Sequence, residues 1–162
     1  MMFLQARWFA AALAVGTVWS PAWAGDGQAP WHLVVHLRSW HGSERPQGQW
    51  NEFNPGLGLR RQLSPDWAWQ VGAYRNSVNR HSAYGLWDWT PWQAGRWSAG
   101  VSAGAVVGGY RERFKPVAGL YGQWQHERWG AALRVFPKPL PGRDPEQHRS
   151  AVTALELSWR LP

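Results

Sequence analysis

Apolar residues recur at every second position in several short stretches of this 162-residue chain, and turn residues such as glycine and proline separate these stretches. Alternation of this kind is typical of β-strands whose two faces have different environments. No stretch shows the apolar spacing of an amphipathic helix. The pattern predicts eight strands, at residues 31–40, 50–63, 66–76, 82–90, 96–110, 115–125, 128–136 and 151–161.

The connections between these strands alternate in length, and the long ones are polar and rich in proline or glycine. The short set is 64–65, 91–95 and 126–127, and the other set is 41–49, 77–81, 111–114 and 137–150. Bacterial outer-membrane barrels have short periplasmic turns, longer extracellular loops and an even number of strands. The sequence therefore predicts an all-β fold, an eight-stranded antiparallel transmembrane β-barrel of the outer membrane. A soluble barrel or sandwich is the less favoured alternative.

The two faces of the predicted strands differ in polarity. In the first strand Leu33 and Val35 alternate with polar or histidine positions, and the last two strands behave in the same way. We expect the apolar set to face lipid and the polar set to face the lumen. The inward-facing polar residues are then His36, Arg38, Arg134 and Glu156. The interior of an eight-stranded barrel holds side chains or one small ligand, so a general porin is excluded.

The N-terminal residues 1–24 have the features of a secretory signal peptide. Arg7 supplies a basic start, an apolar run extends from Trp8 to Trp19, and Ala22-Trp23-Ala24 is typical of a cleavage site. No later stretch has the roughly 20 apolar residues of a membrane-spanning helix. We expect residues 25–162 to form the barrel domain, located in the cell outer membrane.

Composition agrees with a membrane barrel. The chain has 15 tryptophans and 18 glycines, and interfacial girdles of such barrels use indole rings readily. The formal charge of +7 comes from scattered residues, a distribution that fits anionic lipid head groups better than nucleic acid. With no cysteine and no histidine spacing that suits a metal, we expect neither a metal nor another cofactor.

The candidate chemistry lies at the outward ends of the first and third strands, which carry His36 and the pair Asn76-Ser77. A hydroxyl becomes a useful nucleophile when a histidine lies within hydrogen-bond reach and a third group orients that histidine. Strands two places apart lie roughly 10 Å apart, within reach of leaning side chains. The alternative is a hydrogen-bonded lumen in which Arg38, Arg134 and Glu156 only pair with one another.

Several short motifs come in an order and spacing that resembles the lipid A palmitoyltransferase (PagP) family. They are Val35-His36-Leu37, Trp50-Asn51-Glu52, Gly56-Leu57-Gly58-Leu59, Gly72 to Ser77, and Tyr84-Gly85 followed by Trp87 and Trp89. The resemblance spans roughly residues 31–125 and includes the glycine-rich stretch 100–110 and Pro116. Asn76 stands where the family has aspartate.

The resemblance implies transfer of a palmitoyl chain from a phospholipid to lipid A in the outer leaflet, by a monomer that holds the chain inside the barrel. His36 and Ser77 match catalytic positions, and Asn76 is expected to orient His36 or bind an oxyanion. We expect substrate contacts from Arg38, Tyr74 and Arg75 as well, with Gly85 near the end of the acyl-chain site. Two alternatives stay open: a non-catalytic barrel whose outer loops bind a partner, and a lipid A deacylase.

Overall fold

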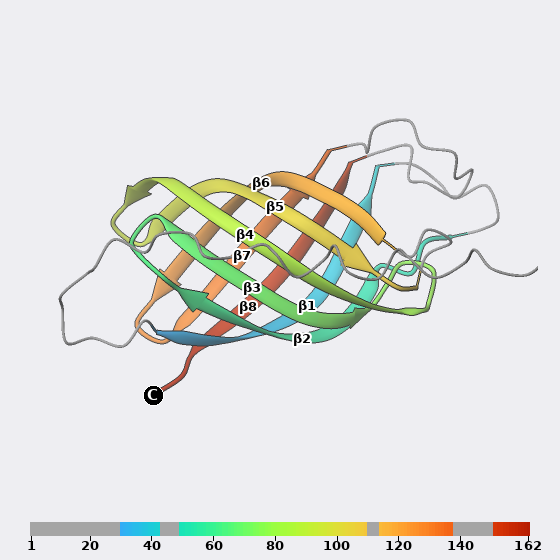
Figure 1. Ribbon diagram of the computed structural model, residues 1–162, viewed down its shortest axis with the longest axis horizontal. Coiled ribbons are helices and arrows are strands. Elements are labelled where there is room, and N and C mark those ends of the chain that lie inside the picture. The colour runs from blue at the N-terminus through green and yellow to red at the C-terminus, as the bar shows by residue number, and fades with distance from the viewer. Residues whose placement is uncertain (1–29, 43–48, 110–113, 138–150) are drawn as a thin grey trace, which may run out of the picture.

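The computed structural model describes residues 30–42, 49–109, 114–137 and 151–162, and these form a closed barrel of eight antiparallel strands (Figure 1). Each strand pairs with its neighbours in sequence, and the first strand pairs with the last to close the sheet. The predicted all-β fold, an eight-stranded antiparallel barrel, is therefore confirmed. The strands are β1 (Trp31–His41), β2 (Phe53–Gln62), β3 (Trp67–Arg75), β4 (His81–Ala94), β5 (Trp97–Val107), β6 (Phe114–His126), β7 (Trp129–Phe136) and β8 (Val152–Arg160).

The barrel has two different ends. The start of β1, the end of β8 and the connections 63–66, 95–96 and 127–128 lie at one end, which we call the turn end (Figure 1). The ends of β1, β3, β5 and β7, the starts of β2, β4, β6 and β8 and the connection 76–80 lie at the other, the loop end. Gly95 and Glu127 have positive φ angles of 60° and 53°, as tight hairpin turns require. The predicted alternation of short and long connections is confirmed.

Three predicted strand boundaries are wrong by three or more residues. The fifth strand ends at Val107, three residues before the predicted end of 110. The second strand begins at Phe53 rather than Trp50. The fourth strand continues to Ala94 instead of ending at Thr90, because the β4–β5 ladder passes an irregularity between Trp89 and Trp92 and then resumes. Pro91 therefore lies inside a strand, at the place where the register shifts and no regular ladder bond is needed. The predicted signal peptide, residues 1–24, and Tyr110 lie outside the described residues.

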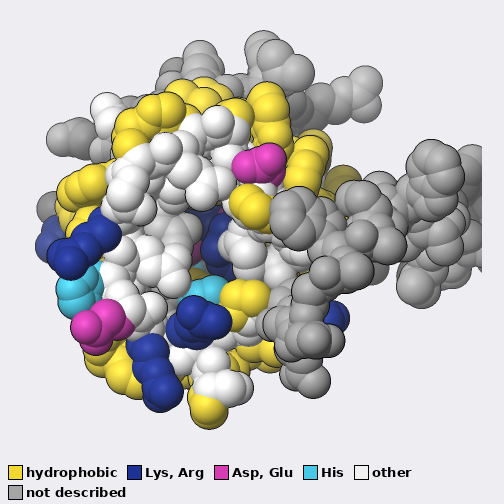
Figure 2. Space-filling model, turned by 90° about the vertical axis from the view of Figure 1, so that its left-hand side faces the viewer, with side chains coloured by type: hydrophobic (Ala, Val, Ile, Leu, Met, Phe, Trp, Pro, Cys, Tyr) yellow, Lys and Arg dark blue, Asp and Glu magenta, His cyan; other side chains and the backbone are white. Residues whose placement is uncertain are grey.

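The barrel is inverted relative to a soluble protein, with a polar interior and an apolar outer surface. The few fully buried hydrophobic residues include Val34, Ala68 and Tyr121, while arginine, aspartate, glutamate and glutamine side chains are buried in the lumen. Large apolar side chains such as Leu57, Trp67 and Leu120 are exposed on the outside. Figure 2 looks at the turn end and shows hydrophobic side chains around much of the circumference, with basic and histidine side chains both near the middle and on part of the rim. This is the face distribution of a transmembrane-type barrel.

A β-bulge in β1 changes which residues face the lumen. The register of β1 shifts between His36 and Arg38 against both β2 and β8. His36 faces inward, and Ser39 is buried beyond the bulge, but Arg38 is exposed. The extra residue reverses the alternation. The inward expectation is thus confirmed for His36, Arg134 and Glu156, and it is wrong for Arg38.

In the described part of the chain, no helix has the length and the hydropathy needed to cross a membrane.

Candidate functional site

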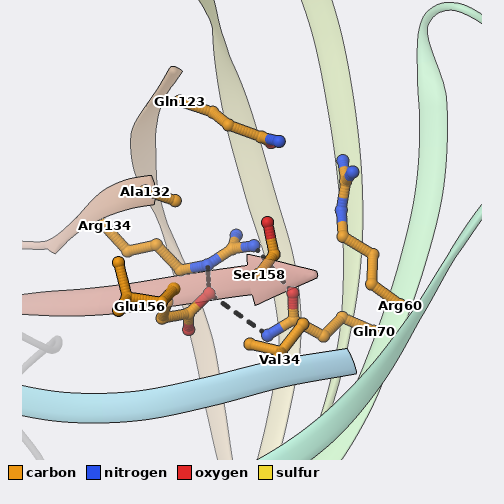
Figure 3. A pocket seen from close by; sticks show the side chains of 9 residues that line it. Val34, Arg60, Gln70, Gln123, Ala132, Arg134, Glu156 and Ser158 are labelled. Carbon is orange, nitrogen blue, oxygen red and sulfur yellow. Dashed lines mark hydrogen bonds and ion pairs between the residues drawn. The ribbon is translucent and has the colours of Figure 1, made fainter. Parts of the chain in front are cut away.

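The lumen is crossed by a buried network centred on Arg134. Its Nη1 donates to Asp88 Oδ1 at 2.8 Å, and its Nε donates to Glu156 Oε2 at 3.0 Å. Its Nη2 donates to Gln70 Oε1 at 3.1 Å, and Nη1 also reaches the Ser102 hydroxyl. Figure 3 shows the guanidinium of Arg134 pointing towards the carboxylate of Glu156 and the amide of Gln70. The predicted pairing of Arg134 with Glu156 is confirmed.

The charges of this network cancel. Arg60 Nε lies 3.3 Å from Asp88 Oδ2, so two arginines face two carboxylates with all four side chains almost fully buried. The cost of burying a charge is recovered only when it is paired and its hydrogen bonds are made. Arg134 therefore has no free donor for a lipid phosphate.

His36 lies beside this network and both of its ring nitrogens face a partner. Its Nε2 lies 2.7 Å from the Tyr84 hydroxyl, and its Nδ1 lies 3.3 Å from Glu156 Oε1. Because Gln70 Nε2 donates to the Tyr84 oxygen at 2.9 Å, the phenolic hydrogen is left to donate to His36 Nε2. The ring hydrogen then sits on Nδ1 and faces the carboxylate.

Asn76 has a different role from the predicted one. Its Oδ1 accepts the backbone N–H groups of Val78 and Arg80, and its Nδ2 donates to the Ser82 hydroxyl. Asparagine side chains commonly stabilise turns in this way. Asn76 is fully buried in these contacts, so its amide holds the 76–80 connection and does not orient His36.

Ser77 lies in the same connection and is 5% exposed. Its backbone oxygen accepts the N–H of Asn51 at 3.0 Å. Among the described residues, no hydrogen bond joins the Ser77 hydroxyl to His36, whose nitrogens face Tyr84 and Glu156. The structure therefore does not bring His36, Asn76 and Ser77 together as a hydrogen-bonded set.

The motif around Asn51 and Asn54 braces the same rim. Asn54 Nδ2 donates to the backbone oxygen of Arg75, and Asn51 Nδ2 donates to the backbone oxygen of Asn76. Asn54 Oδ1 accepts from the Ser39 hydroxyl at 2.5 Å. Part of the polar motif pattern that suggested chemistry at the loop end is thus explained by links between β1, β2 and the end of β3.

The four residues expected to contact substrate lie in different environments. Arg38 is exposed, pairs with Glu52 and lies 5.5 Å from the Trp40 ring centroid, and Arg75 is exposed as well. Tyr74 faces the lumen, with its ring centroid 5.7 Å from that of His36. Gly85 alternates with the buried Tyr84 and Leu86 and therefore lies on the outer face. The expectation that Gly85 ends an acyl-chain site is wrong, because Tyr84 is the residue that points inward there.

The lumen lining changes from polar to apolar along the barrel. Towards the turn end the inward residues are His32, Arg60, Gln70, Asp88, Ser102, Gln123 and Arg134, and most of them are almost fully buried. Towards the loop end, strands β5 to β8 present Gly104, Val106, Val117, Phe136 and Ala154, which keep intermediate exposure, and the same alternation turns Lys115 inward nearest the rim. The opposite wall presents the rings of Tyr74 and Tyr84. His36 and Glu156 lie where the two halves meet.

The turn-end half holds little free space. One cavity there has a volume of about 10 Å³, roughly the space of a single water molecule, and is lined by Arg60, Gln70, Gln123, Arg134 and Glu156 among others (Figure 3). Such a space admits no acyl chain. Among the described residues no group of three or more histidine, aspartate or glutamate side chains is arranged to hold a metal ion.

Sequence reasoning missed Asp88, Gln70 and the role of Tyr84. Asp88 stands between Trp87 and Trp89 in a strand whose alternate residues are outward-facing indoles. A single carboxylate between such neighbours must face inward, and an inward carboxylate in a narrow barrel needs a cation. That signal, read together with Arg134, predicts the pair.

Comparison with known proteins agrees on the fold and adds no function. A de novo designed barrel, TMB2.3, whose structure was solved by solution NMR, matches with a TM-score of 0.60 and 15% sequence identity. The match covers 85% of this chain and 98% of the designed one. No protein-family model and no curated protein matches the chain.

Proposed function

We propose that the protein is an outer-membrane lipid A acyltransferase that accepts an acyl chain of a phospholipid in the loop-end half of its lumen. The observation that carries this proposal is the division of the lumen, with an apolar, partly exposed lining above a filled polar layer. An acyl chain of the donor fits the apolar side chains of β5 to β8, and the Arg134 network closes the way towards the turn end. With the loop end outside the cell, the site opens towards the leaflet that contains lipid A.

In this proposal Ser77 and His36 remain the residues to test first. Ser77 lies in the loop-end connection after β3, and the ring of Tyr74, close to the end of that strand, contacts His36. For His36 to assist the Ser77 hydroxyl, Nε2 must exchange Tyr84 for that hydroxyl when substrate binds. Geometry of catalytic groups is often looser without substrate and tightens in the complex.

Two prolines give the lipid substrates a candidate route between strands. Pro55 precedes Gly56, opposite the bulge in β1, where the β1–β2 register shifts. Pro116 lies in β6 opposite Ala105 and has no N–H to donate to the ladder. A weakened ladder at either place favours lateral entry of an acyl chain.

A second candidate is a non-catalytic barrel that presents its loops to a partner. The observation in its favour is that His36 and Asn76 are fully engaged in structural contacts. The deacylase alternative gains nothing from the geometry.

Mass spectrometry of lipid A from cells that express the protein separates these functions. Acyl transfer adds the mass of one acyl chain in the wild type, and Ser77→Ala removes the added mass. Ser98→Ala, at the turn end of β5, is the matched control, and lipid A from cells that express it keeps the added mass. A mass loss indicates deacylation. An unchanged lipid A spectrum from cells that contain the folded wild-type barrel contradicts both enzymatic hypotheses and favours the loop-presenting barrel.

A further inference from the structure

Arg61 is a charged residue on the outer, apolar face of the barrel. Its neighbour in β2, Arg60, is buried in the lumen and contacts Asp88, so the alternation of the strand turns Arg61 outward. The register places Arg61 directly between Trp31 of β1 and Trp69 of β3. Its guanidinium carbon lies 5.2 Å from the Trp31 ring centroid, and the two indole rings form an edge-to-face pair at 5.4 Å.

This site belongs to a tryptophan belt around the turn end. Of the described tryptophans, only Trp40 and Trp50 lie towards the loop end. The belt consists of Trp31, Trp67, Trp69, Trp87, Trp89, Trp92, Trp97, Trp124, Trp129 and Trp159. Indole rings prefer the boundary between the apolar core of a membrane and its head groups, because the ring is apolar and the N–H is polar. The belt therefore places Arg61 at head-group level.

The charge of Arg61 has no counter-ion within the described chain. None of the ion pairs or hydrogen bonds between described residues involves its side chain, and its Nε is buried without a hydrogen-bond partner. A charge on the lipid face of a barrel costs about 2–4 kcal/mol at the middle of the membrane and little near the interface. The contact with Trp31 offsets part of this cost, and an anion that meets the terminal nitrogens of Arg61 at the interface would supply the missing counter-ion.

We infer that Arg61, between Trp31 and Trp69, binds the phosphodiester of a phospholipid in the leaflet at the turn end. The planar guanidinium presents two parallel donors that match two phosphate oxygens. The neighbouring indoles supply N–H donors and apolar surface for the glycerol and the first methylenes of the lipid. This site is independent of acyl transfer, because it lies on the outer wall at the opposite end from Ser77.

Native mass spectrometry of the purified full chain in a maltoside detergent, with phosphatidylglycerol added, tests the inference. The wild type is expected to retain one more phosphatidylglycerol than Arg61→Gln, with the affinity of that lipid lowered roughly five- to tenfold in the variant. Arg61→Lys keeps the charge without the planar guanidinium, and its affinity for the lipid is expected to lie between those of the wild type and Arg61→Gln. Arg80→Gln, which removes an exposed arginine at the loop end, is the control and binds like the wild type.

Equal lipid retention by the wild type and Arg61→Gln would overturn the inference. Displacement of the lipid by millimolar inorganic phosphate would overturn it too, since the site would then recognise a free anion rather than a lipid. Trp69→Leu keeps Arg61 and removes one indole, so a loss of binding in this variant supports the site even where Arg61→Gln does not fold.

Discussion

His36 and Glu156 are register partners across the β1–β8 seam that closes the barrel, and Nδ1 of the histidine lies 3.3 Å from Oε1 of the glutamate. The carboxylate holds Arg134 through its other oxygen. One side chain therefore connects the candidate histidine to the charge network of the lumen. The protonation and orientation of His36 depend on that network.

Replacing Glu156 with glutamine is expected to move the ring hydrogen of His36 from Nδ1 to Nε2. Arg134 and Gln70 both donate to Oε2 of Glu156, so the amide oxygen of the variant stays on their side and its NH₂ group faces Nδ1. Side-chain ¹⁵N NMR of histidine distinguishes the two tautomers. Glu52→Gln, at the exposed pair with Arg38, leaves the His36 signals unchanged. An Nδ1–H tautomer retained in Glu156→Gln would contradict this account.

Removal of Arg134 is expected to destabilise the barrel strongly. Arg134→Ala leaves Asp88 and Glu156 buried without their main cation, and loss of one partner from a buried pair costs about 3–5 kcal/mol. Arg38→Ala breaks an exposed pair with Glu52, which is worth roughly 0.2–1 kcal/mol. Urea unfolding in lipid vesicles, followed by tryptophan fluorescence, measures both. A similar loss for the two variants would show that the lumen is hydrated and the network unimportant.

Gly58 and Gly72 are expected to be intolerant of alanine because the Tyr84 side chain and the backbone of the facing strand lie against both, with the Leu57 carbonyl oxygen 2.5 Å from a Cβ at Gly72. An added Cβ at Gly58 would fall on the Tyr84 hydroxyl, and one at Gly72 would lie 2.7 Å from its ring carbon Cε1. Forced displacement of a packed ring costs about 1–3 kcal/mol. Gly85→Ala is the control, because its Cβ would meet only Val71 Cγ1 at 3.9 Å. The unfolding midpoints of the three alanine variants measure the difference. Equal midpoints would contradict the prediction.

Asn76→Asp and Asn76→Ala are expected to differ in how much they destabilise the 76–80 connection. Aspartate keeps an acceptor for the N–H groups of Val78 and Arg80, whereas alanine leaves both without it and costs about 1–2 kcal/mol. Amide hydrogen exchange of these two residues reports the difference directly. Faster exchange in Asn76→Ala alone supports a turn-stabilising role. If neither variant changes exchange but lipid A modification is lost in both, Asn76 acts on substrate instead.

The strand pattern and its faces are predictable from sequence because an apolar outer surface and a polar interior impose a strict alternation. Arg134 and Glu156 were recognised as inward partners for that reason. The outward position of Arg38 is not predictable in this way, because a bulge of one residue leaves no mark in the composition of β1 yet reverses every later position. The candidate site is harder to predict from sequence than the strands are. Asn76 and Ser77 stand out as polar residues at a strand end, but only the three-dimensional contacts show that the Asn76 amide is used by its own turn.

The Arg134 network also bears on how the barrel assembles. Its hydrogen bonds join residues far apart in sequence: 86 positions separate Gln70 from Glu156, and 46 separate Asp88 from Arg134. These bonds form only when the last two strands have met the first four, so the network is completed late, when the barrel closes. Interactions absent from the transition state slow unfolding without speeding folding. We therefore expect the buried charges to slow the unfolding of the closed barrel more than they speed its folding.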